Sequence, residues 1–334
     1  MTEPAVIAAT EGRIGGLRLN RPRALNALDR DMIRSLRAAL AGWRAAPAVH
    51  AVVIDSTSDR AFCAGGDIRA IRDHALAGEA DAVEQFFAGE YALNAEIAAF
   101  SKPYVALIDG ICMGGGIGIS VHGALRVATE QAVFAMPETA IGMFPDIGAT
   151  FLLPRLPGAL GLFLGLTGQR LTGADAVHAG LATHFVPRAR LASLRTALAA
   201  DGVAAVATHA APLPPFTLAP HRAAIDRCFT TATVPDILAR LAAEDTEWAR
   251  DTLATLGRMS PSALCWSAAA ISRGATLELG AALAAELRLT RHVTRHPDFA
   301  EGVRAMVVDK DRTPHWSPPT LAGVVPAAIA GMLQ

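Results

Sequence analysis

The chain has 334 residues, of which 52% are hydrophobic and 18% charged, with a formal net charge of −1 at pH 7. This length allows one large domain or a core with an appendage, and the composition is that of a globular protein. The balanced charge argues against nucleic acid as a partner, because nucleic-acid-binding proteins present basic surfaces. The high apolar fraction is compatible with buried contacts between copies of the chain, and therefore with a homo-oligomer.

The cysteines are spaced neither as disulfide pairs nor as metal ligands. We therefore expect free thiols in a reducing compartment and a cytoplasmic protein. The first residues, with Glu3 and Pro4, are typical neither of a secretory signal nor of an Arg-rich transit peptide. No stretch reaches 18 apolar residues, so we expect no membrane contact through a spanning helix. The four cysteines are Cys63, Cys112, Cys228 and Cys265.

Predicted strands and helices alternate from the N-terminus. Residues 5–9 and 14–19 read as a β-hairpin, and Asp29 is a plausible N-cap of the helix that follows. Residues 51–54 form a buried strand, and the loop over 58–66 ends in the motif A-F-C-A-G-G-D. A long helical region then runs to about residue 100 and is interrupted near a glycine at position 78.

The stretch from residue 102 to 156 carries the strongest functional pattern. A buried strand over 104–108 precedes three glycines, Gly114 to Gly116, and a helix predicted over 117–122. A strand, a glycine turn and a helix leave backbone N–H groups unpaired at the helix start. Such donors bind phosphate, or an oxyanion that develops during acyl chemistry. The alternative is that the glycines only let the helix pack close to the strand.

Two carboxylates follow in an otherwise apolar segment, after short predicted strands at 126–129 and 132–134. Pro137 is well placed to start a short helix with Glu138 in its first turn. Glu138 could simply complement the helix dipole there, and Asp146 could cap a helix that starts at residue 147. Together with the glycine turn, the two carboxylates instead suggest a pocket with oxyanion donors and an acid/base pair.

Several known motifs do not fit the glycine turn. The dinucleotide fingerprint G-x-G-x-x-G fails at Ile119, and no Gly-Lys-Ser/Thr follows to make a P-loop. The nucleophile elbow G-x-S-x-G around Ser120 fails at His122, and these two side chains cannot face each other on a helix. A second glycine turn, Gly65-Gly66, also follows an apolar stretch. Two backbone N–H groups from separate turns are a common way to build an oxyanion hole.

Glu138 is the best candidate for an acid/base group or a nucleophile, because burial would raise the pKa of its carboxyl. Asp146 could orient Glu138 or hold a substrate hydroxyl. Glu90 could reach the same pocket, or lie on a solvated helix face. Arg23 and Arg69 flank the two N-terminal loops, where they either meet phosphates or remain solvated.

The pattern changes along the chain near residue 210. Strands and helices alternate over roughly the first 190 residues, which favours an α/β core over 1–210. Four prolines then cluster between residues 211 and 220, the best candidate for a linker. Residues 221–334 read as mainly α-helical.

Taken together, these motifs resemble the crotonase superfamily of acyl-CoA enzymes. The A-F-C-A-G-G-D and M-G-G-G segments are similar to its two oxyanion-hole loops. Within it, the chain resembles the branch that hydrolyses 3-hydroxyisobutyryl-CoA in valine breakdown. The segments that match this branch are M-P-E-T-A-I-G-M-F-P-D, L-P-R-L, R-L-T-G-A-D, G-L-A-T-H-F-V and D-F-A-E-G-V-R-A.

The resemblance implies a spiral of repeated β-β-α units and a role for each motif. The N–H groups of Gly66 and Gly115 would hold the thioester oxygen, and Glu138 would be catalytic. Glu90 and Asp146 would bind the substrate, together with Gly115 and Glu138, and Asp146 would also belong to the catalytic set. Contacts with CoA would come from three positions: Arg23, Ala64 and Arg69.

One departure from the superfamily bears on the reaction. Enoyl-CoA hydratases carry a first catalytic glutamate just past the glycine turn, where this chain has Gly118. Hydration of a double bond needs two acid/base groups, so the change favours hydrolysis. An enoyl-CoA hydratase or isomerase and a non-catalytic CoA-binding paralogue remain the alternatives. The expected partner is an acyl-CoA, and no metal or redox cofactor is implied.

Overall fold

This computed structural model describes residues 3–231 and 233–333. Contacts within the chain divide it into two compact units, each assembled from three separate stretches. The expected division into residues 1–210 and 221–334 stays a prediction. Unit 1 comprises Met1–Asp67, Gly89–Phe134 and Arg170–Thr217, and unit 2 comprises Ile68–Ala88, Ala135–Gln169 and Leu218–Gln334.

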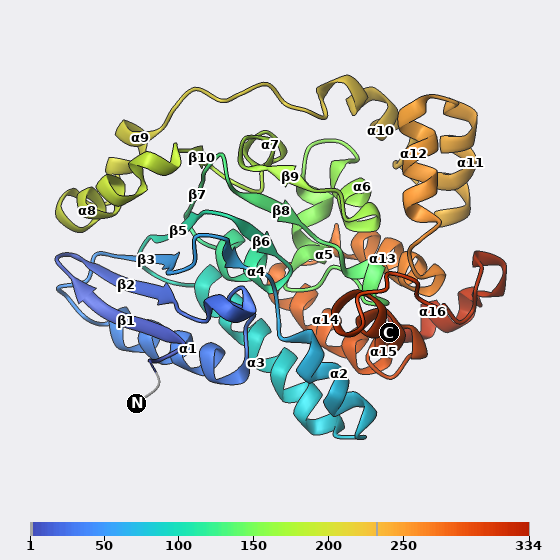
Figure 1. Ribbon diagram of the computed structural model, residues 1–334, viewed down its shortest axis with the longest axis horizontal. Helices are drawn as coiled ribbons and strands as arrows, with labels where there is room; N and C mark the ends of the chain where they lie inside the picture. The colour runs from blue at the N-terminus through green and yellow to red at the C-terminus, as the bar shows by residue number, and fades with distance from the viewer. Residues whose placement is uncertain (1–2, 232, 334) are drawn as a thin grey trace. The chain divides into compact units, whose positions relative to one another are not determined.

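Unit 1 contains a six-stranded sheet with the order β1-β2-β3-β5-β7-β10 (Figure 1). β1 and β2 run antiparallel, with Val6 opposite Leu19, which confirms the predicted hairpin. The other neighbouring pairs are parallel. The strands are β1 (Val6–Glu11), β2 (Ile14–Leu19), β3 (Ala51–Ser56), β5 (Tyr104–Ile108), β7 (Leu125–Ala128) and β10 (His184–Phe185).

A buried apolar layer fixes this sheet. Val105 and Leu107 point to the same face of β5 because side chains alternate along a strand. They join a buried cluster with Val53 of β3 and with Leu194 and Leu198 of α8 (Leu191–Asp201). Each fully buried side chain of this kind contributes roughly 1.5–3 kcal/mol. The sheet is therefore a rigid base for the loops that leave its strands.

A second, four-stranded sheet has the order β4-β6-β8-β9. Two of its strands, β4 and β6, were not predicted from the sequence, because three residues are too few to show a periodicity. The predicted strands near 126–129 and 132–134 are present, but they belong to different sheets as β7 and β8. The strands of this second sheet are β4 (Ala61–Cys63), β6 (Ile111–Met113), β8 (Val133–Ala135) and β9 (Leu171–Thr172).

The two sheets are built by a repeated unit. β3, β5 and β7 lie in the large sheet, and the strand that follows each of them, β4, β6 or β8, lies in the small sheet. A helix comes next in each case: α2 (Ile68–Leu76), α4 (Gly115–Val121) or the short helix η2 (Glu138–Ile141). This order confirms the expected β-β-α repeats and the α/β fold class.

The first helix begins where the sequence predicts. In α1 (Arg30–Arg44), the Asp29 carboxylate accepts a hydrogen bond of 2.8 Å from the Met32 N–H, which confirms the predicted N-cap. The long helical region is interrupted as expected, because α3 (Ala80–Ala98) starts anew after Gly78. The remaining helices of unit 1 are α7 (Gly173–Ala179), α9 (Ala205–His209), η1 (Pro22–Ala24) and η4 (Arg188–Arg190).

Unit 2 is mainly helical, as the sequence predicts for residues after 221. Besides α2, its helices are α5 (Ala149–Leu152), α6 (Leu160–Thr167), α10 (Arg222–Cys228), α11 (Val234–Glu244), α12 (Glu247–Leu256), α13 (Pro261–Gly274), α14 (Leu279–Val293), α15 (Pro297–Val303) and α16 (Pro326–Met332). Shorter turns are η3 (Leu153–Arg155), η5 (Ala219–His221), the π-helical η6 (Arg304–Val308) and η7 (Leu321–Gly323).

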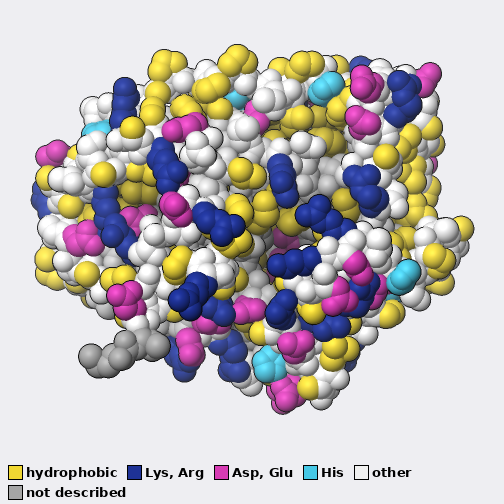
Figure 2. All heavy atoms as spheres, in the orientation of Figure 1, with side chains coloured by type: hydrophobic (Ala, Val, Ile, Leu, Met, Phe, Trp, Pro, Cys, Tyr) yellow, Lys and Arg dark blue, Asp and Glu magenta, His cyan; other side chains and the backbone are white. Residues whose placement is uncertain are grey.

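The surface in view carries charges of both signs. Lys and Arg side chains lie interspersed with Asp and Glu side chains (Figure 2), in keeping with the net charge of −1. Among the described residues, no helix combines the length and the apolar character that crossing a bilayer requires.

Candidate functional site

The two glycine turns of unit 1 leave the same edge of the small sheet. β4 leads into Gly65-Gly66 and β6 leads into Gly114-Gly115, and the two strands are parallel neighbours with Cys63 beside Cys112. The φ angles of Gly65 and Gly114 are 114° and 46°, in the region that favours glycine. The sequence therefore bends sharply after each strand and brings the two turns together.

At this edge, the backbone N–H groups of Gly66 and Gly115 can donate hydrogen bonds to a bound group. Gly66 forms a parallel bridge with Leu28, and this bridge uses the Gly65 carbonyl and the Asp67 N–H, each at 2.8 Å. The N–H of Gly66 itself therefore points away from Leu28. Gly115 is the first residue of α4, whose opening N–H groups have no intrahelical acceptor. A Cβ atom added at Gly115 would lie 3.3 Å from the Gly66 nitrogen, so the two donors are close.

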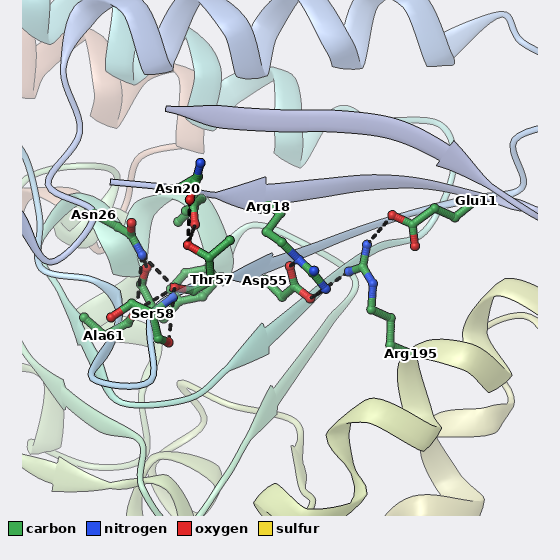
Figure 3. Close-up of polar contacts among 12 residues, drawn as sticks. Glu11, Arg18, Asn20, Asn26, Asp55, Thr57, Ser58, Ala61 and Arg195 are labelled. Atoms are coloured by element: carbon green, nitrogen blue, oxygen red, sulfur yellow. Dashed lines mark hydrogen bonds and ion pairs between the residues drawn. The ribbon is translucent and has the colours of Figure 1, made fainter. Parts of the chain in front are cut away.

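Asn26 holds β4, the strand that leads into the first of these turns (Figure 3). Its side chain is fully buried, and Nδ2 donates to the Ser56 hydroxyl at 2.7 Å and to the Phe62 carbonyl at 2.9 Å. Its Oδ1 accepts a hydrogen bond of 2.8 Å from the Arg21 N–H. The φ angle of Asn26 is 56°, a conformation that asparagine tolerates better than most residues. Our sequence analysis missed this role, although an asparagine within an apolar loop was a visible signal.

Glu90 lies against the second turn. It is 2% exposed on α3, so the alternative of a solvated helix face is wrong. A Cβ atom added at Gly115 would meet Oε1 of Glu90 at 2.2 Å, so a side chain here would displace this carboxylate. Burial raises the pKa of the Cys63 thiol to about 12, and the nearby charge of Glu90 adds to that rise. Cys63 is therefore a packed thiol and no nucleophile.

The helix after the second turn offers no acid/base side chain at its start. Gly118 is buried in the first turns of α4. Ser120 is 1% exposed, and its hydroxyl donates to the carbonyls of Gly116 and Ile117, both at 2.9 Å. A hydroxyl bonded to its own helix in this way is a structural group. This agrees with the rejection of a nucleophile elbow.

In unit 2, Glu138 opens a short helix as predicted. The 3₁₀ helix η2 begins at Glu138 with Pro137 at its N-cap, and Gly142 ends it with a φ of 66°. Glu138 is 6% exposed, so its carboxyl lies in a largely dry environment. Water-excluded carboxylates of this kind are suited to proton transfer or nucleophilic attack.

Residues far along the chain hold η2 in place. The Ser260 N–H donates to the Thr139 carbonyl at 3.2 Å, and the Ser260 hydroxyl donates to Asp298 at 2.5 Å. Asp298 is fully buried on α15. A Cβ atom added at Gly142 would lie 2.3 Å from the Asp298 carbonyl oxygen, so the turn packs tightly on α15. The orientation of Glu138 therefore depends on contacts that lie far away in sequence.

Asp146 does not cap a helix, and this alternative from the sequence is wrong. The helix α5 begins at Ala149 with Gly148 at its N-cap, so the Asp146 side chain is not in the capping position. The backbone carbonyl of Asp146 accepts the Ala149 N–H at 2.8 Å. Asp146 is 6% exposed, and the turn after it contains Ile147 at a φ of 58°. A β-branched residue at positive φ is strained, and such strain concentrates at functional sites.

The three positions expected to contact CoA lie near the surface. Arg23 is exposed in η1, and Ala64 is half-buried between β4 and the first glycine turn. Arg69 is exposed near the start of α2, where its guanidinium donates to the Val307 carbonyl at 3.2 Å. Their contact with CoA stays a prediction. Within residues 3–231 and 233–333, no group of three or more His, Cys, Asp or Glu side chains is arranged to hold a metal ion.

A family model described as enoyl-CoA hydratase/isomerase matches residues 14–333. Among curated proteins, the chain is similar to 3-hydroxyisobutyryl-CoA hydrolase, mitochondrial, of Xenopus tropicalis, with 45% identity over 325 residues. This match covers 94% of the chain and 84% of that protein. The human protein of the same name is 42% identical over 331 residues, which cover 96% of the chain and 86% of that protein.

Two solved structures cover almost the whole chain. One is described as a carnitinyl-CoA dehydratase from Mycobacterium thermoresistibile, with a TM-score of 0.95. The other is described as an enoyl-CoA hydratase from Rhodobacter sphaeroides 2.4.1, with a TM-score of 0.92. Each is 41% identical, and each match covers 99% of this chain and 97% of the other. The solved structures share the fold of this chain, and their names give a different reaction from the names of the curated proteins.

Proposed function

The chain belongs to the enoyl-CoA hydratase/isomerase family, and on this premise we propose that it hydrolyses 3-hydroxyisobutyryl-CoA, or a related short 3-hydroxyacyl-CoA. The products are free CoA and the 3-hydroxy acid. The chain is thus an acyl-CoA thioester hydrolase with a crotonase-type fold. Valine catabolism is the role that goes with the name of its curated relatives.

Gly118 is the observation that favours hydrolysis over hydration. Addition of water to a double bond, or its removal, needs two acid/base groups that act on the same water. By the resemblance to hydratases, the first of these groups would stand at Gly118, which has no side chain. Because two similar solved structures are described as a dehydratase and a hydratase, addition or removal of water at a double bond is the alternative reaction. By the same resemblance, Glu138 and Asp146 would instead form the carboxylate pair of the hydrolase branch.

The N–H groups of Gly66 and Gly115 stabilise the oxyanion in the proposed reaction. When a nucleophile attacks the thioester carbonyl, the negative charge moves to the carbonyl oxygen. Two fixed backbone donors stabilise this charge and need no reorganisation at that moment. Loss of one such donor typically costs about 3 kcal/mol of barrier. The tight approach of Glu90 to Gly115 supports a role for Glu90 in substrate binding at this turn.

Glu138 supplies the second half of the chemistry. It either attacks the carbonyl to give an anhydride that water then opens, or it removes a proton from the attacking water. In both routes the C–S bond breaks, the CoA sulfur takes up one proton of the consumed water to give the free thiol, and over repeated turnovers one water oxygen ends in each product carboxylate. Asp146 orients Glu138 and accepts a hydrogen bond from the substrate hydroxyl. No step uses a metal ion or a redox cofactor.

The CoA part of the substrate and the other expected partners complete the proposal. We assign the CoA part of the substrate to Arg23, Ala64 and Arg69, and we expect neither nucleic acid nor membrane as a partner. A homo-oligomer remains compatible with the apolar composition. The four cysteines are free thiols, and this supports a reducing compartment such as the cytoplasm.

A thiol-release assay over a small panel of acyl-CoAs tests this function. Purified protein should release free CoA from 3-hydroxyisobutyryl-CoA in the presence of a chelator and without nicotinamide. Rapid hydration of crotonyl-CoA with the thioester left intact would instead place the chain with the hydratases. Tight binding of acyl-CoA with neither reaction would identify a non-catalytic paralogue.

A further inference from the structure

A buried acidic residue in unit 2 lies outside the proposed catalytic set. Glu286 is 2% exposed on α14, within the apolar stripe that faces the interior of the unit. A carboxyl group is rarely buried unless it is hydrogen-bonded, because its desolvation is costly. Its partners therefore show what the burial serves.

The carboxyl of Glu286 accepts three hydrogen bonds from the turn after Asp146. Its Oε2 accepts from the Gly148 N–H at 2.7 Å, and its Oε1 accepts from the Thr150 N–H at 3.0 Å. The Thr150 hydroxyl also donates to Oε1, at 2.5 Å. Each oxygen thus serves a different backbone N–H, so both oxygens must be acceptors.

The turn that Glu286 holds contains a strained backbone conformation at Ile147. Ile147 and Gly148 have φ angles of 58° and 81°, and this conformation is strained for a β-branched residue such as isoleucine. Such a conformation persists only where its surroundings determine it. The bonds from Gly148 and Thr150 to Glu286 lie directly after the strained residue and provide this constraint.

We propose that Glu286 is a positioning residue, which holds the turn Asp146–Thr150 and so sets the direction of the Asp146 side chain toward the substrate. The proposal rests on the role that the proposed function gives to Asp146. Glu286 itself touches no reacting atom. It acts through the backbone that carries Asp146.

The pKa of Glu286 reflects its burial, the charge of Asp146 and the hydrogen bonds that it accepts. Burial raises the pKa of Glu286 to about 8, and the nearby charge of Asp146 adds to the rise, while the three donated hydrogen bonds oppose it. The hydrogen bonds from Gly148 and Thr150 thus favour the charged carboxylate, in which both oxygens accept, against the effects of burial and of Asp146.

Glu286→Gln tests the proposal, because an amide has one acceptor oxygen where the carboxyl has two. Whichever way the amide is oriented, one of the two N–H groups, of Gly148 or Thr150, loses its acceptor and faces an N–H₂ group. We expect kcat for 3-hydroxyisobutyryl-CoA to fall by about 10-fold or more, with KM nearly unchanged. The preference for 3-hydroxy over unsubstituted acyl groups should weaken as well.

A double-mutant cycle separates positioning from general stability. If Glu286 acts through Asp146, Glu286→Gln should lower kcat by less than about 2-fold in a protein that already carries Asp146→Asn. Full additivity of the two changes would overturn the proposal. Asp175→Asn is the matched control, because Asp175 is also buried and accepts bonds from Thr172 and Thr217. It should lower the melting temperature and leave the rate per folded molecule near normal.

Thr150 provides a second test that avoids Glu286 itself. Thr150→Val keeps the shape of the side chain and removes the hydroxyl donor, whereas Thr150→Ser keeps the donor. The serine variant should retain kcat and the valine variant should lose several-fold. Equal rates in both would overturn the proposal even where Glu286→Gln fails to fold.

The double-mutant cycle also distinguishes the proposed role of Asp146 from the proposed role of Glu286. If Asp146→Asn leaves rate and selectivity intact, the proposed role of Asp146 fails, and the positioning role of Glu286 fails with it. If Asp146→Asn is slow while Glu286→Gln and Thr150→Val turn over normally, only the role of Glu286 fails.

Discussion

The glycine turns of unit 1 and the carboxylate segment of unit 2 are built in opposite ways. The turns offer backbone N–H groups, and neighbouring strands and the loop that carries Asn26 fix them. The segment offers the side chains of Glu138 and Asp146. The backbone under these two side chains is held by residues of α13, α14 and α15, more than a hundred positions away.

This difference predicts how each region responds to mutation. A backbone donor is removed only by a change of the backbone itself, so the turns should tolerate most substitutions outside their glycines. A side-chain carboxylate can be lost directly or through the residues that hold its backbone. The predictions below go from the largest expected loss of rate to the smallest, and the last concerns stability.

Glu138→Gln should have the largest effect. It keeps the size of the side chain but removes the charge, so neither attack nor proton removal remains. We expect single-turnover cleavage to slow by about 1,000-fold or more, while the affinity for a CoA ester, measured separately, survives. Near-normal cleavage by a folded variant would reduce the site to a CoA-binding site.

Gly115→Pro should be next, with a loss of about 100- to 1,000-fold from the missing donor. A side chain at this position also collides with Glu90, so Gly115→Ala is the matched control that keeps the N–H. The difference in kcat between the two variants isolates the hydrogen bond. Equal rates in the proline and alanine variants would remove Gly115 from the oxyanion hole.

Asp146→Asn should lower kcat by roughly 10- to 100-fold, the cost of weakening a hydrogen bond to a charged group. It should also reduce the preference for 3-hydroxy over unsubstituted acyl-CoAs. Competition between the two substrates measures this selectivity. A lower melting temperature with an unchanged rate per folded molecule would show that Asp146 is structural only.

The last prediction concerns the pH dependence of stability and not the rate. The pKa of Glu286 rises from 4.5 to about 8 on folding, so the folded state binds more protons between these values. Its contribution to stability is fully present below about pH 4.5 and is lost as pH rises through 8. The melting temperature of the wild type minus that of Glu286→Gln should therefore fall across this range. A difference that is constant with pH would contradict the raised pKa.

The glycine turns could be predicted from the sequence because the signals are local. Gly65 and Gly114 adopt positive φ angles, which glycine does most readily, although the short strands β4 and β6 before them were not predicted. The predictions of Glu138 at the start of a short helix and of Asp29 as a helix cap were confirmed for the same reason. Each of these features depends on residues within about four positions.

The features that the sequence did not reveal depend on contacts between distant segments. The Asp146 cap was wrong because Glu286 helps to fix a strained turn, and α5 then starts two residues later than predicted. Glu90 could not be assigned to a buried or solvated face, because its burial depends on the packing around Gly115. A glutamate within the apolar stripe of α14 was the one signal of Glu286 that the sequence contained.

The central claim is that water attacks the thioester carbonyl and not a carbon–carbon double bond. Turnover of 3-hydroxyisobutyryl-CoA in ¹⁸O-labelled water, followed by mass spectrometry of the products, tests it most directly. We expect one labelled oxygen in the carboxylate of the 3-hydroxy acid, and one molecule of free thiol for each molecule of this acid. Label in the 3-hydroxyl group of an intact thioester would reveal dehydration and rehydration, and would contradict the account.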